Sequence, residues 1–382
     1  MVRLVSSSRM GSSLVLGRIA GIRIGIHWSW VFVFTLFVWT LASGVFPSTN
    51  PDLSDEAHLA MAVVAAVLFF VSVLLHELGH ALQARRERIE IEGITLWLFG
   101  GVATLKGAFK SAGAELRIAI AGPVVSLVLG VVFVAIAVLA PAEAVEGVAA
   151  WLGYVNLALL VFNLVPAVPL DGGRILHAVL WHVRGDFARA TRTTTSIGRG
   201  FGYLLIAGGV AFFIVGEPFS GVWLAFLGWF LLTAAGAEGQ YAAAREALAG
   251  LHVRDLMAED PVSVPPDLTL GEFMDEVVWR RRYTTYPVVE SGEAVGLVPF
   301  RKVAEVPRTE WDSRRVRECM VPLEDVPVFA VDEDAMEAFA RLTRTTLGRG
   351  LVVEGRRLVG LLSVTDLARA LELPPRLGTA EA

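Results

Sequence analysis

Long apolar runs, separated by short polar segments, dominate the first two thirds of the chain. The runs fall near residues 25–46, 58–82, 116–140, 150–181, 200–216 and 220–238. A helix needs about 20 apolar residues to cross the hydrocarbon core of a bilayer, which is about 30 Å thick. The pattern therefore predicts a polytopic α-helical membrane protein with about six transmembrane helices.

The residues after position 240 differ in composition. Residues 1–239 contain 15 Lys or Arg and 14 Asp or Glu, whereas the shorter segment 240–382 contains 18 and 24. The mean hydropathy of the whole chain is nevertheless +0.59. We expect a transmembrane domain over 1–239, a linker over 240–249 and a soluble tail. The net charge of −5, with no long Lys/Arg run, argues against nucleic-acid binding.

The loops between the predicted spans fall into two classes by charge. Loops 47–57, 140–148 and 216–220 contain acidic residues but no Lys or Arg. The other connections carry basic residues, such as Arg85 and Arg86 after the second span. Because cytoplasmic loops are enriched in Lys and Arg, this division predicts a multi-pass protein with both termini in the cytoplasm.

The second apolar run ends in LLHELGHALQARR, which contains ionisable side chains at membrane depth. His76 and His80 are four residues apart, the spacing that lets two imidazoles on one helical face bind one zinc ion. Glu77 adjoins the first histidine, where a carboxylate can act as the base that activates water. Ionisable groups inside a span are costly and indicate a functional site. A pair of histidines bonded only to backbone carbonyls is the alternative.

A catalytic zinc ion needs a third protein ligand. Asp171, in FNLVPAVPLDGGR, is the only carboxylate between Glu146 and Asp186 and is our candidate. We expect the prolines and glycines around it to prevent a regular helix there. Pairing with Arg174 is the alternative role for Asp171. Asn163 offers an amide that either holds a substrate carbonyl or satisfies freed backbone groups.

Four motifs together resemble the site-2 protease family of intramembrane zinc metalloproteases. They are HELGH in the second span, FGG at 99–101, AGP at 121–123 and NLVPAVPLDGG at 163–173. The resemblance implies one zinc ion per chain, with the following site residues: His76, His80 and Asp171 as metal ligands, Glu77 as general base and Asn163 as a catalytic residue that orients the substrate.

The same resemblance implies how a substrate is held and what it is. The strand that contains Phe99, Gly100 and Gly101 is expected to bind an unwound substrate helix by adding it as a further strand. The expected substrate is a transmembrane protein in a bacterial cell membrane, such as an anti-sigma factor or a pro-protein.

Two other functions fit part of this pattern. In a divalent-cation transporter or channel, the His/Asp cluster would be the transport site and the tail would be a gate. Glu77 distinguishes the two functions, because peptide hydrolysis requires a base and cation binding does not. A catalytically inactive scaffold is disfavoured, since every expected metal-binding and base residue is present.

The tail contains two similar halves, which predict a compact α/β module. The repeated segments are VRDLM at 253–257 with VRECM at 316–320, and PVVESGEAVGLV at 287–298 with LVVEGRRLVGLL at 351–362. This doubling resembles a tandem CBS-domain module. The predicted bounds are 250–309 for the first CBS domain, 310–374 for the second and 375–382 for a flexible tail.

The CBS resemblance implies an adenine nucleotide, ATP, ADP or AMP, in the cleft of the module. Thr365 and Asp366 match the turn that contacts the ribose in this family, whereas the first half has Pro299 and Phe300 there. One nucleotide site is therefore expected. A module that forms a homodimer or docks substrate without nucleotide remains an alternative, with Asp366 acting only as a helix cap.

Overall fold

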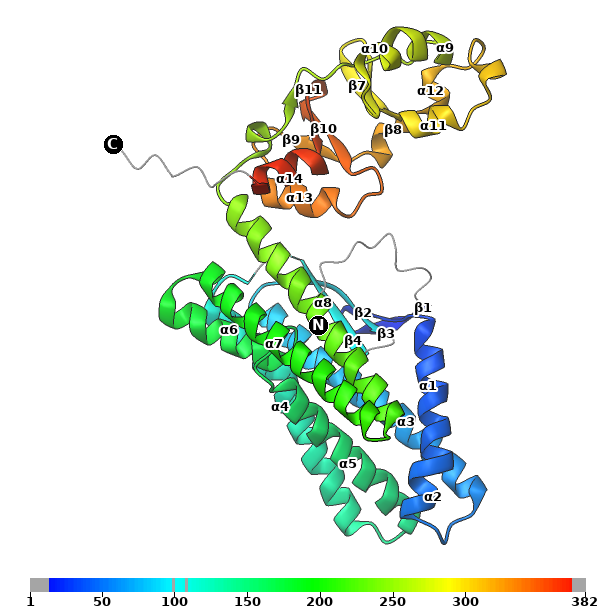
Figure 1. Ribbon diagram of the computed structural model, residues 1–382, viewed down its shortest axis with the longest axis vertical. Coiled ribbons are helices and arrows are strands. Elements are labelled where there is room, and N and C mark those ends of the chain that lie inside the picture. Colours follow the sequence, from blue (N-terminus) through cyan, green and yellow to red (C-terminus); the bar gives the residue numbers. More distant parts are fainter. Residues whose placement is uncertain (1–13, 98–99, 107–108, 373–382) are drawn as a thin grey trace. The chain divides into compact units, whose positions relative to one another are not determined.

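The computed structural model of the chain describes residues 14–97, 100–106 and 109–372 (Figure 1). The chain divides into two compact units, with the boundary between Ala242 and Ala243. This boundary lies inside helix α8 (Pro218–Ala247), so the first residues of the proposed linker are helical. Phe99 and the proposed tail 375–382 lie outside the described residues.

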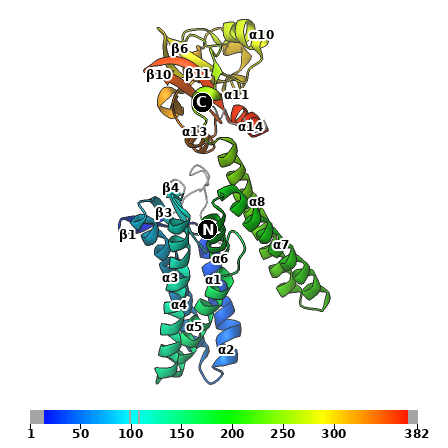
Figure 2. The ribbon, with the colours of Figure 1, turned by 90° about the vertical axis from the view of Figure 1, so that its left-hand side faces the viewer.

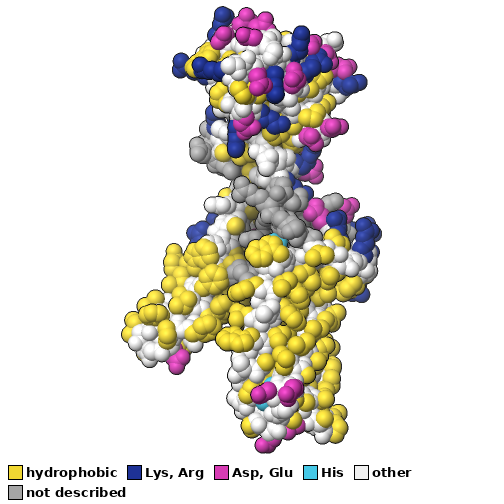
Figure 3. All heavy atoms as spheres, turned by 90° about the vertical axis from the view of Figure 1, so that its right-hand side faces the viewer, with side chains coloured by type: hydrophobic (Ala, Val, Ile, Leu, Met, Phe, Trp, Pro, Cys, Tyr) yellow, Lys and Arg dark blue, Asp and Glu magenta, His cyan; other side chains and the backbone are white. Residues whose placement is uncertain are grey.

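Six helical segments of the first unit are long and apolar enough to cross a membrane. They are Ser29–Thr49, Asp55–Arg86, Ala112–Leu139, Glu143–Asn163, Phe187–Ile214 and Pro218–Ala247. The first combines α1 (Ser29–Thr40), a π-helical stretch (Leu41–Val45) and α2 (Phe46–Thr49), and the others are α3, α4, α5, α7 and α8. Apolar side chains cover much of the outer surface of these helices (Figure 3). The predicted number of spans is confirmed.

The fourth predicted span, 150–181, is wrong as a single element. α5 runs from Glu143 to Asn163, and a separate helix, α6, runs from Asp171 to Arg184. Pro166 and Pro169 lie in the segment between them, where neither can continue a helix. The break therefore precedes Asp171 instead of surrounding it.

Gly172 and Gly173 belong to the first turn of α6, contrary to the expectation that they would prevent a helix there. A Cβ at Gly172 would lie 2.2 Å from the carbonyl oxygen of Leu164, and one at Gly173 would lie 2.3 Å from the amide nitrogen of Val168. The glycines thus let the start of α6 pack directly on the preceding backbone.

A four-stranded sheet accompanies the helices. Its strands are β1 (Leu14–Ile19), β2 (Ile22–Ile26), β3 (Glu90–Trp97) and β4 (Gly100–Lys106), in the order β1-β2-β3-β4. β2 and β3 are parallel, and the other two pairs are antiparallel. The strand expected at Gly100 and Gly101 is present as β4, which forms a hairpin with β3. The β1–β2 hairpin was not predicted.

The sheet packs against the second half of α3 (Asp55–Arg86). Buried Ile22, Ile24, Ile94 and Ala103 of the sheet contact Leu78 and Ala81 of the helix. α3 also packs on α4 and α5, and the three helices lie side by side in both ribbon views (Figure 1, Figure 2). The sheet and α4 therefore enclose the part of α3 that carries HELGH.

α7 (Phe187–Ile214) and α8 approach each other through glycines. A Cβ at Gly209 would lie 2.5 Å from the carbonyl oxygen of Gly221, and one at Gly202 would lie 3.0 Å from that of Gly228. Small residues of this kind allow close packing between helices in a membrane, where burial of apolar surface does not drive association.

The second unit is an α/β module. Its strands are β5 (Ala258–Glu259), β6 (Thr285–Glu290), β7 (Glu293–Pro299), β8 (Val321–Pro322), β9 (Val328–Ala330), β10 (Arg349–Glu354) and β11 (Arg357–Ser363). Its helices include α9 (Leu270–Glu272), α10 (Trp279–Arg281), α11 (Phe300–Ala304), α12 (Val316–Cys319), α13 (Ala335–Leu342) and α14 (Val364–Glu372). The main strand order is β6-β7-β11-β10-β9.

The repeat seen in the sequence is visible as two equivalent hairpins, β6–β7 and β10–β11, which adjoin where Glu293 pairs with Arg357. Each half has its own apolar core, one around Phe273 and Tyr286 and the other around Phe329 and Leu362. The predicted tandem arrangement of the tail is confirmed.

Candidate metal centre

α3 presents three ionisable side chains from its second half. The helix is 32 residues long and begins at Asp55, after Ser54, whose side chain accepts a hydrogen bond from the amide of Ala57. His76 and Glu77 are 4% and 7% exposed, and His80 is partly buried. A single regular helix thus positions both histidines and the carboxylate, as the spacing in the sequence predicts.

The start of α6 brings Asp171 to the two histidines. Its Oδ2 is 3.1 Å from Nε2 of His76, and its Oδ1 is 3.3 Å from Nε2 of His80. The two Nε2 atoms are 3.2 Å apart. Asp171 therefore contacts both histidines, while the guanidinium of Arg174 lies over the ring of Phe109.

Residues of α4 (Ala112–Leu139) contact the other nitrogen of each imidazole. Nδ1 of His80 donates to the carbonyl oxygen of Ile118 at 2.7 Å. Nδ1 of His76 is 2.9 Å from Oγ of Ser126, which can accept its proton. With the proton on Nδ1, each ring directs the lone pair of Nε2 toward the other histidine and Asp171, the tautomer that a metal ligand needs.

The donor atoms fit one tetrahedral zinc ion. Donors about 2.0–2.1 Å from a common centre in a tetrahedron are about 3.3 Å apart. The two Nε2 atoms are 3.2 Å apart, and each lies 3.1 or 3.3 Å from one of the two oxygens of Asp171. Two imidazoles and one carboxylate also make up a ligand set typical of catalytic zinc, which leaves a fourth position free.

Gly122 of α4 borders the same group of atoms. A Cβ at this position would lie 2.2 Å from Nε2 of His80 and 2.7 Å from Nε2 of His76. The missing side chain leaves room beside the donor atoms. Gly122 and Ser126 were not predicted as site residues, although the AGP motif that contains Gly122 was noted.

Glu77 lies against strand β4. A Cβ at Gly101 would lie 2.3 Å from Cγ and 3.1 Å from Cδ of Glu77. Gly100 is the first residue of the same strand, which pairs only with β3 among the described strands. Within the described part of the chain, the other edge of β4 is therefore unpaired, in a strand that adjoins the candidate base.

Asn163 is the last residue of α5 and is half-buried. Among the described residues, no hydrogen bond or ion pair joins it to His76, His80 or Asp171. A nearby amide, Asn156, is fully buried and donates from Nδ2 to the carbonyl oxygen of Leu152 at 2.8 Å.

The remaining histidines of the membrane unit have other surroundings. His27 bonds to Oγ of Ser29 at 2.8 Å, and His182 is exposed on α6. His177 is buried and bonded on both nitrogens, to Glu115 and Thr191. None of the three contributes a donor to the cluster of His76, His80 and Asp171.

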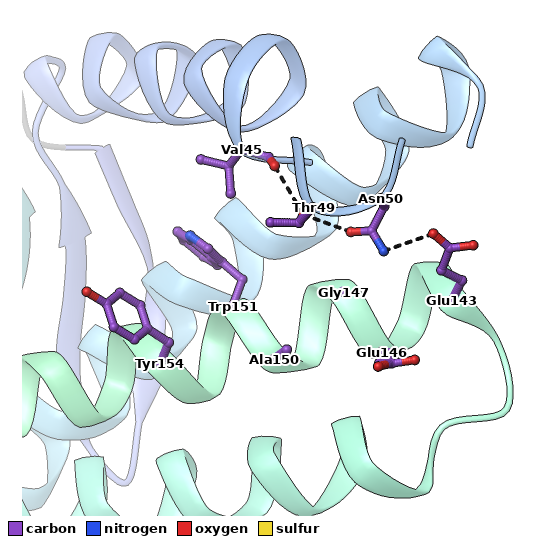
Figure 4. Close-up of a pocket in the computed structure, with 9 residues that line it drawn as sticks. All are labelled: Val45, Thr49, Asn50, Glu143, Glu146, Gly147, Ala150, Trp151 and Tyr154. Carbon is purple, nitrogen blue, oxygen red and sulfur yellow. Dashed lines mark hydrogen bonds between the residues drawn. The ribbon is translucent and has the colours of Figure 1, made fainter. Parts of the chain in front are cut away.

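A separate pocket lies near the first residues of α5, at the end of the helix away from Asn163 (Figure 4). It has a volume of about 480 Å³, and Trp151, Tyr154 and Glu146 are among the side chains that line it. Asn50 and Glu143 both line the pocket, and Nδ2 of Asn50 donates a hydrogen bond to Oε1 of Glu143 at 3.2 Å. None of the proposed catalytic residues lines this pocket.

In the second unit, Asp366 is bonded to Ser363 at the start of α14. Its Oδ2 accepts hydrogen bonds from Oγ of Ser363 at 2.5 Å and from the amide of Ser363 at 3.0 Å. The amide of Asp366 donates in return to Oγ of Ser363 at 3.3 Å. Thr365 is exposed beside it. Ser363 is therefore the residue that caps α14, and Asp366, the third residue of the helix, completes a capping box with it. Asp366 as the cap itself was wrong, although it does take part in the cap.

Comparisons with known proteins identify both units. Residues 64–144 and 140–207 match peptidase family M50, and residues 253–308 and 316–373 match the CBS domain. Rip3 of Mycobacterium tuberculosis, whose name describes a zinc metalloprotease, is 38% identical over 373 residues, covering 95% of this chain and 94% of its own. A zinc metalloprotease of Methanocaldococcus jannaschii is 31% identical, covering 95% and 97%.

Among solved structures, the site-2 protease from Methanocaldococcus jannaschii is 30% identical. It covers 60% of this chain and 95% of its own, with a TM-score of 0.42. The relatives named above span almost the whole length of this chain, membrane unit and tail together. The chain therefore belongs to peptidase family M50, the site-2 proteases, and is a multi-pass membrane zinc metalloprotease with a C-terminal pair of CBS domains.

Proposed function

We propose that the protein cleaves a peptide bond within or near a transmembrane segment of a membrane-bound protein, the reaction of regulated intramembrane proteolysis. One observation carries this proposal. The cluster of His76, His80 and Asp171 lies beside the buried carboxylate of Glu77, on a helix that is apolar and long enough to cross a membrane. Ionisable groups at that depth are costly unless they serve a function.

In this proposal His76, His80 and Asp171 hold the zinc ion. The bound ion supplies Lewis-acid chemistry, which polarises the scissile carbonyl and makes water a stronger acid. Glu77 takes a proton from the attacking water as its oxygen bonds to the carbonyl carbon. Glu77 then delivers that proton to the amide nitrogen as the C–N bond breaks, which leaves a carboxylic acid and an amine.

The substrate main chain is proposed to lie along the free edge of β4. Gly100 and Gly101 present backbone groups there without side chains in the way, and Gly101 adjoins Glu77. Phe99, which precedes this strand, and Asn163 are proposed to contact the substrate as well. An extended segment bound in this way has lost its helical hydrogen bonds, which exposes its peptide bonds to water.

The test uses the purified full-length enzyme in liposomes with a single-span substrate, a pro-protein or an anti-sigma factor. Cleavage should stop on addition of a zinc chelator and return with added zinc. Glu77→Gln should retain about one zinc ion per chain but lose cleavage, whereas His76→Ala should lose both. Normal cleavage by Glu77→Gln would contradict the assigned base.

We further propose that the protein lies in a bacterial cell membrane with both termini in the cytoplasm. The support is the positive-inside pattern, since Lys and Arg are missing from loops 47–57, 140–148 and 216–220. In that orientation the CBS module faces cytoplasmic nucleotides.

The CBS module is proposed to bind ATP, ADP or AMP through Thr365 and Asp366 and to regulate cleavage. The support is that Thr365 is exposed and that Asp366, the next residue, is not fully buried. A homodimer formed through the module is the second proposed role. Equilibrium dialysis with labelled nucleotide and the full-length enzyme tests the first role, and sedimentation with and without nucleotide tests the second.

A further inference from the structure

A second group of buried side chains that can ionise or form hydrogen bonds lies outside the metal centre. Glu115 of α4, His177 of α6 and Thr191 of α7 are 4%, 5% and 3% exposed. Nδ1 of His177 is 2.7 Å from Oε2 of Glu115, and its Nε2 is 2.9 Å from Oγ1 of Thr191. These residues are neither proposed metal ligands nor the proposed base, so their burial requires a separate explanation.

The hydrogen-bond directions in this group are fixed by Thr191. Its hydroxyl donates to the carbonyl oxygen of Phe187 at 2.9 Å, so its oxygen accepts a proton from Nε2 of His177. Nδ1 and the Glu115 carboxylate then share the other proton along a short bond. Bonds of this type are stronger than those between neutral groups, and a buried partner left alone is costly. His177 is therefore held tightly to α4.

The same face of α4 also orients the histidines of α3. Glu115, Ile118, Gly122 and Ser126 follow one another at spacings of three, four and four residues, which places them on one side of the helix. Ile118 and Ser126 bond the imidazoles, and Gly122 borders their Nε2 atoms. α4 is thus a common support for the ligands on α3 and for the helix that begins with Asp171.

α6 needs such a support. It has 14 residues, is not one of the six candidate spans, and follows the irregular segment 164–170. His177 lies six residues after Asp171 on this helix, so a shift of α6 along α4 moves the carboxylate as well. Ligand distances in a zinc site tolerate only about 0.2 Å of error.

We propose that Glu115 and His177 are positioning residues for the third metal ligand. Their bond sets the place of α6 against α4 and so holds Asp171 at the correct distance from His76 and His80. The inference rests on the zinc site proposed above, but it assigns a role to residues that touch neither the metal nor the substrate.

The test measures zinc affinity, with Zn²⁺ itself and a competing chelator, on the full-length protein in detergent. The double variant Glu115→Leu/His177→Leu removes the bond and leaves no unpaired charge, because both partners become apolar. We expect it to release zinc at about 10- to 100-fold lower chelator concentration. The visible absorption of the Co²⁺-loaded protein should also change. Glu115→Gln keeps a hydrogen bond, because its side-chain amide can donate to Nδ1 of neutral His177, and it should keep nearly normal affinity.

A matched control removes another buried polar contact between helices. Asn156→Leu breaks the contact from Nδ2 of Asn156 to Oγ of Ser72, 3.4 Å long, which joins α5 to α3 without involving α6. It should leave zinc affinity and the Co²⁺ spectrum unchanged. Thr191→Val keeps the shape of the side chain and removes only the hydroxyl that bonds His177. It should lower zinc affinity several-fold, and it tests the proposal if the double variant fails to fold.

The outcomes separate this inference from the zinc site itself. If the folded double variant and Thr191→Val both keep wild-type zinc affinity and spectrum, Glu115 and His177 do not position Asp171. If instead His76→Ala and Asp171→Ala bind zinc as the wild type does, the proposed set of zinc ligands is wrong, whatever Glu115 and His177 do.

Discussion

The Cα atom of Gly122 faces Nε2 of His80 so closely that a methyl group on it would come within 2.2 Å of that nitrogen. The same methyl group would lie 2.7 Å from Nε2 of His76. α4 thus contributes to the site in two ways, through bonds from Ile118 and Ser126 and through a missing side chain. The space beside the donor atoms depends on a residue that makes no polar contact with them.

Gly122→Ala should therefore weaken zinc binding without unfolding the helix. Alanine favours a helix over glycine by about 1 kcal/mol, so α4 itself should not weaken. The methyl group should push the imidazoles apart and lower zinc affinity on the order of 100-fold. Metal analysis of the purified protein checks this. Gly113→Ala on the same helix meets only the end of the Arg117 side chain, at 3.3 Å, and should keep its zinc.

Gly101→Ala should separate metal binding from catalysis. Its Cβ would lie 2.3 Å from Cγ of Glu77, so the carboxylate must move. Loss of a positioned general base typically costs about 10²- to 10⁴-fold in rate. We expect kcat to fall in that range while zinc content stays near one ion per chain. Unchanged kcat in a well-folded variant would show that Glu77 is not held against β4 during the reaction.

The contact between α7 and α8 should be sensitive to single methyl groups. A Cβ at Gly209 would lie 2.5 Å from the carbonyl oxygen of Gly221, which is backbone and cannot rotate away. A Cβ at the neighbouring Gly208 meets only the end of the Leu224 side chain, at 3.3 Å. Gly209→Ala should therefore lower the melting temperature in detergent, and Gly208→Ala should not. Equal melting of the two variants would argue against this close packing.

The sequence alone was enough to predict that His76, His80 and Asp171 lie together. The spacing of His76 and His80 placed them on one helical face, and the rarity of carboxylates in the apolar spans singled out Asp171. The residues around them were not predictable in the same way. Gly122 acts through the absence of a side chain, and the bond partners Ile118 and Ser126 depend on how α3 and α4 pack.

Two errors in the predicted elements have physical causes. The β1–β2 hairpin was missed because the alternating Ile22, Ile24 and Ile26 merge with the apolar run that follows, so strand and helix signals overlap. The fourth span was drawn too long because Pro166 and Pro169 sit in an apolar segment. Hydropathy does not register the loss of backbone hydrogen bonds at prolines.

Membrane orientation can be measured with single cysteines. Burial raises the pKa of the Cys319 thiol above its usual value, so little thiolate forms at neutral pH and reaction should increase only as pH rises. In a Cys319→Ser background, a cysteine at exposed Asp52 should react with an impermeant thiol reagent on intact cells. One at exposed Arg192 should react only after the cells are opened. The reverse labelling would overturn the proposed cytoplasmic termini.

Nucleotide binding by the tail requires a control for helix capping, because Asp366 already bonds Ser363 at the start of α14. Loss of a capping side chain costs about 0.5–2 kcal/mol of stability whatever else the residue does. Glu272 is a matched reference, since its Oε2 accepts from the amide and the hydroxyl of Thr269 at the start of α9, as the Asp366 carboxylate does with Ser363.

Asp366→Ala and Glu272→Ala should therefore destabilise the CBS module to a similar degree. If Asp366 also contacts a ribose, only Asp366→Ala should weaken the binding of ATP, ADP or AMP to the full-length enzyme, by about 10-fold for each 1.4 kcal/mol lost. Effects of nucleotide on cleavage should be modest, about 5- to 150-fold, because coupling between separate sites is typically 1–3 kcal/mol. Equal binding by the two variants would assign Asp366 to capping alone, and the module to dimerisation or substrate docking.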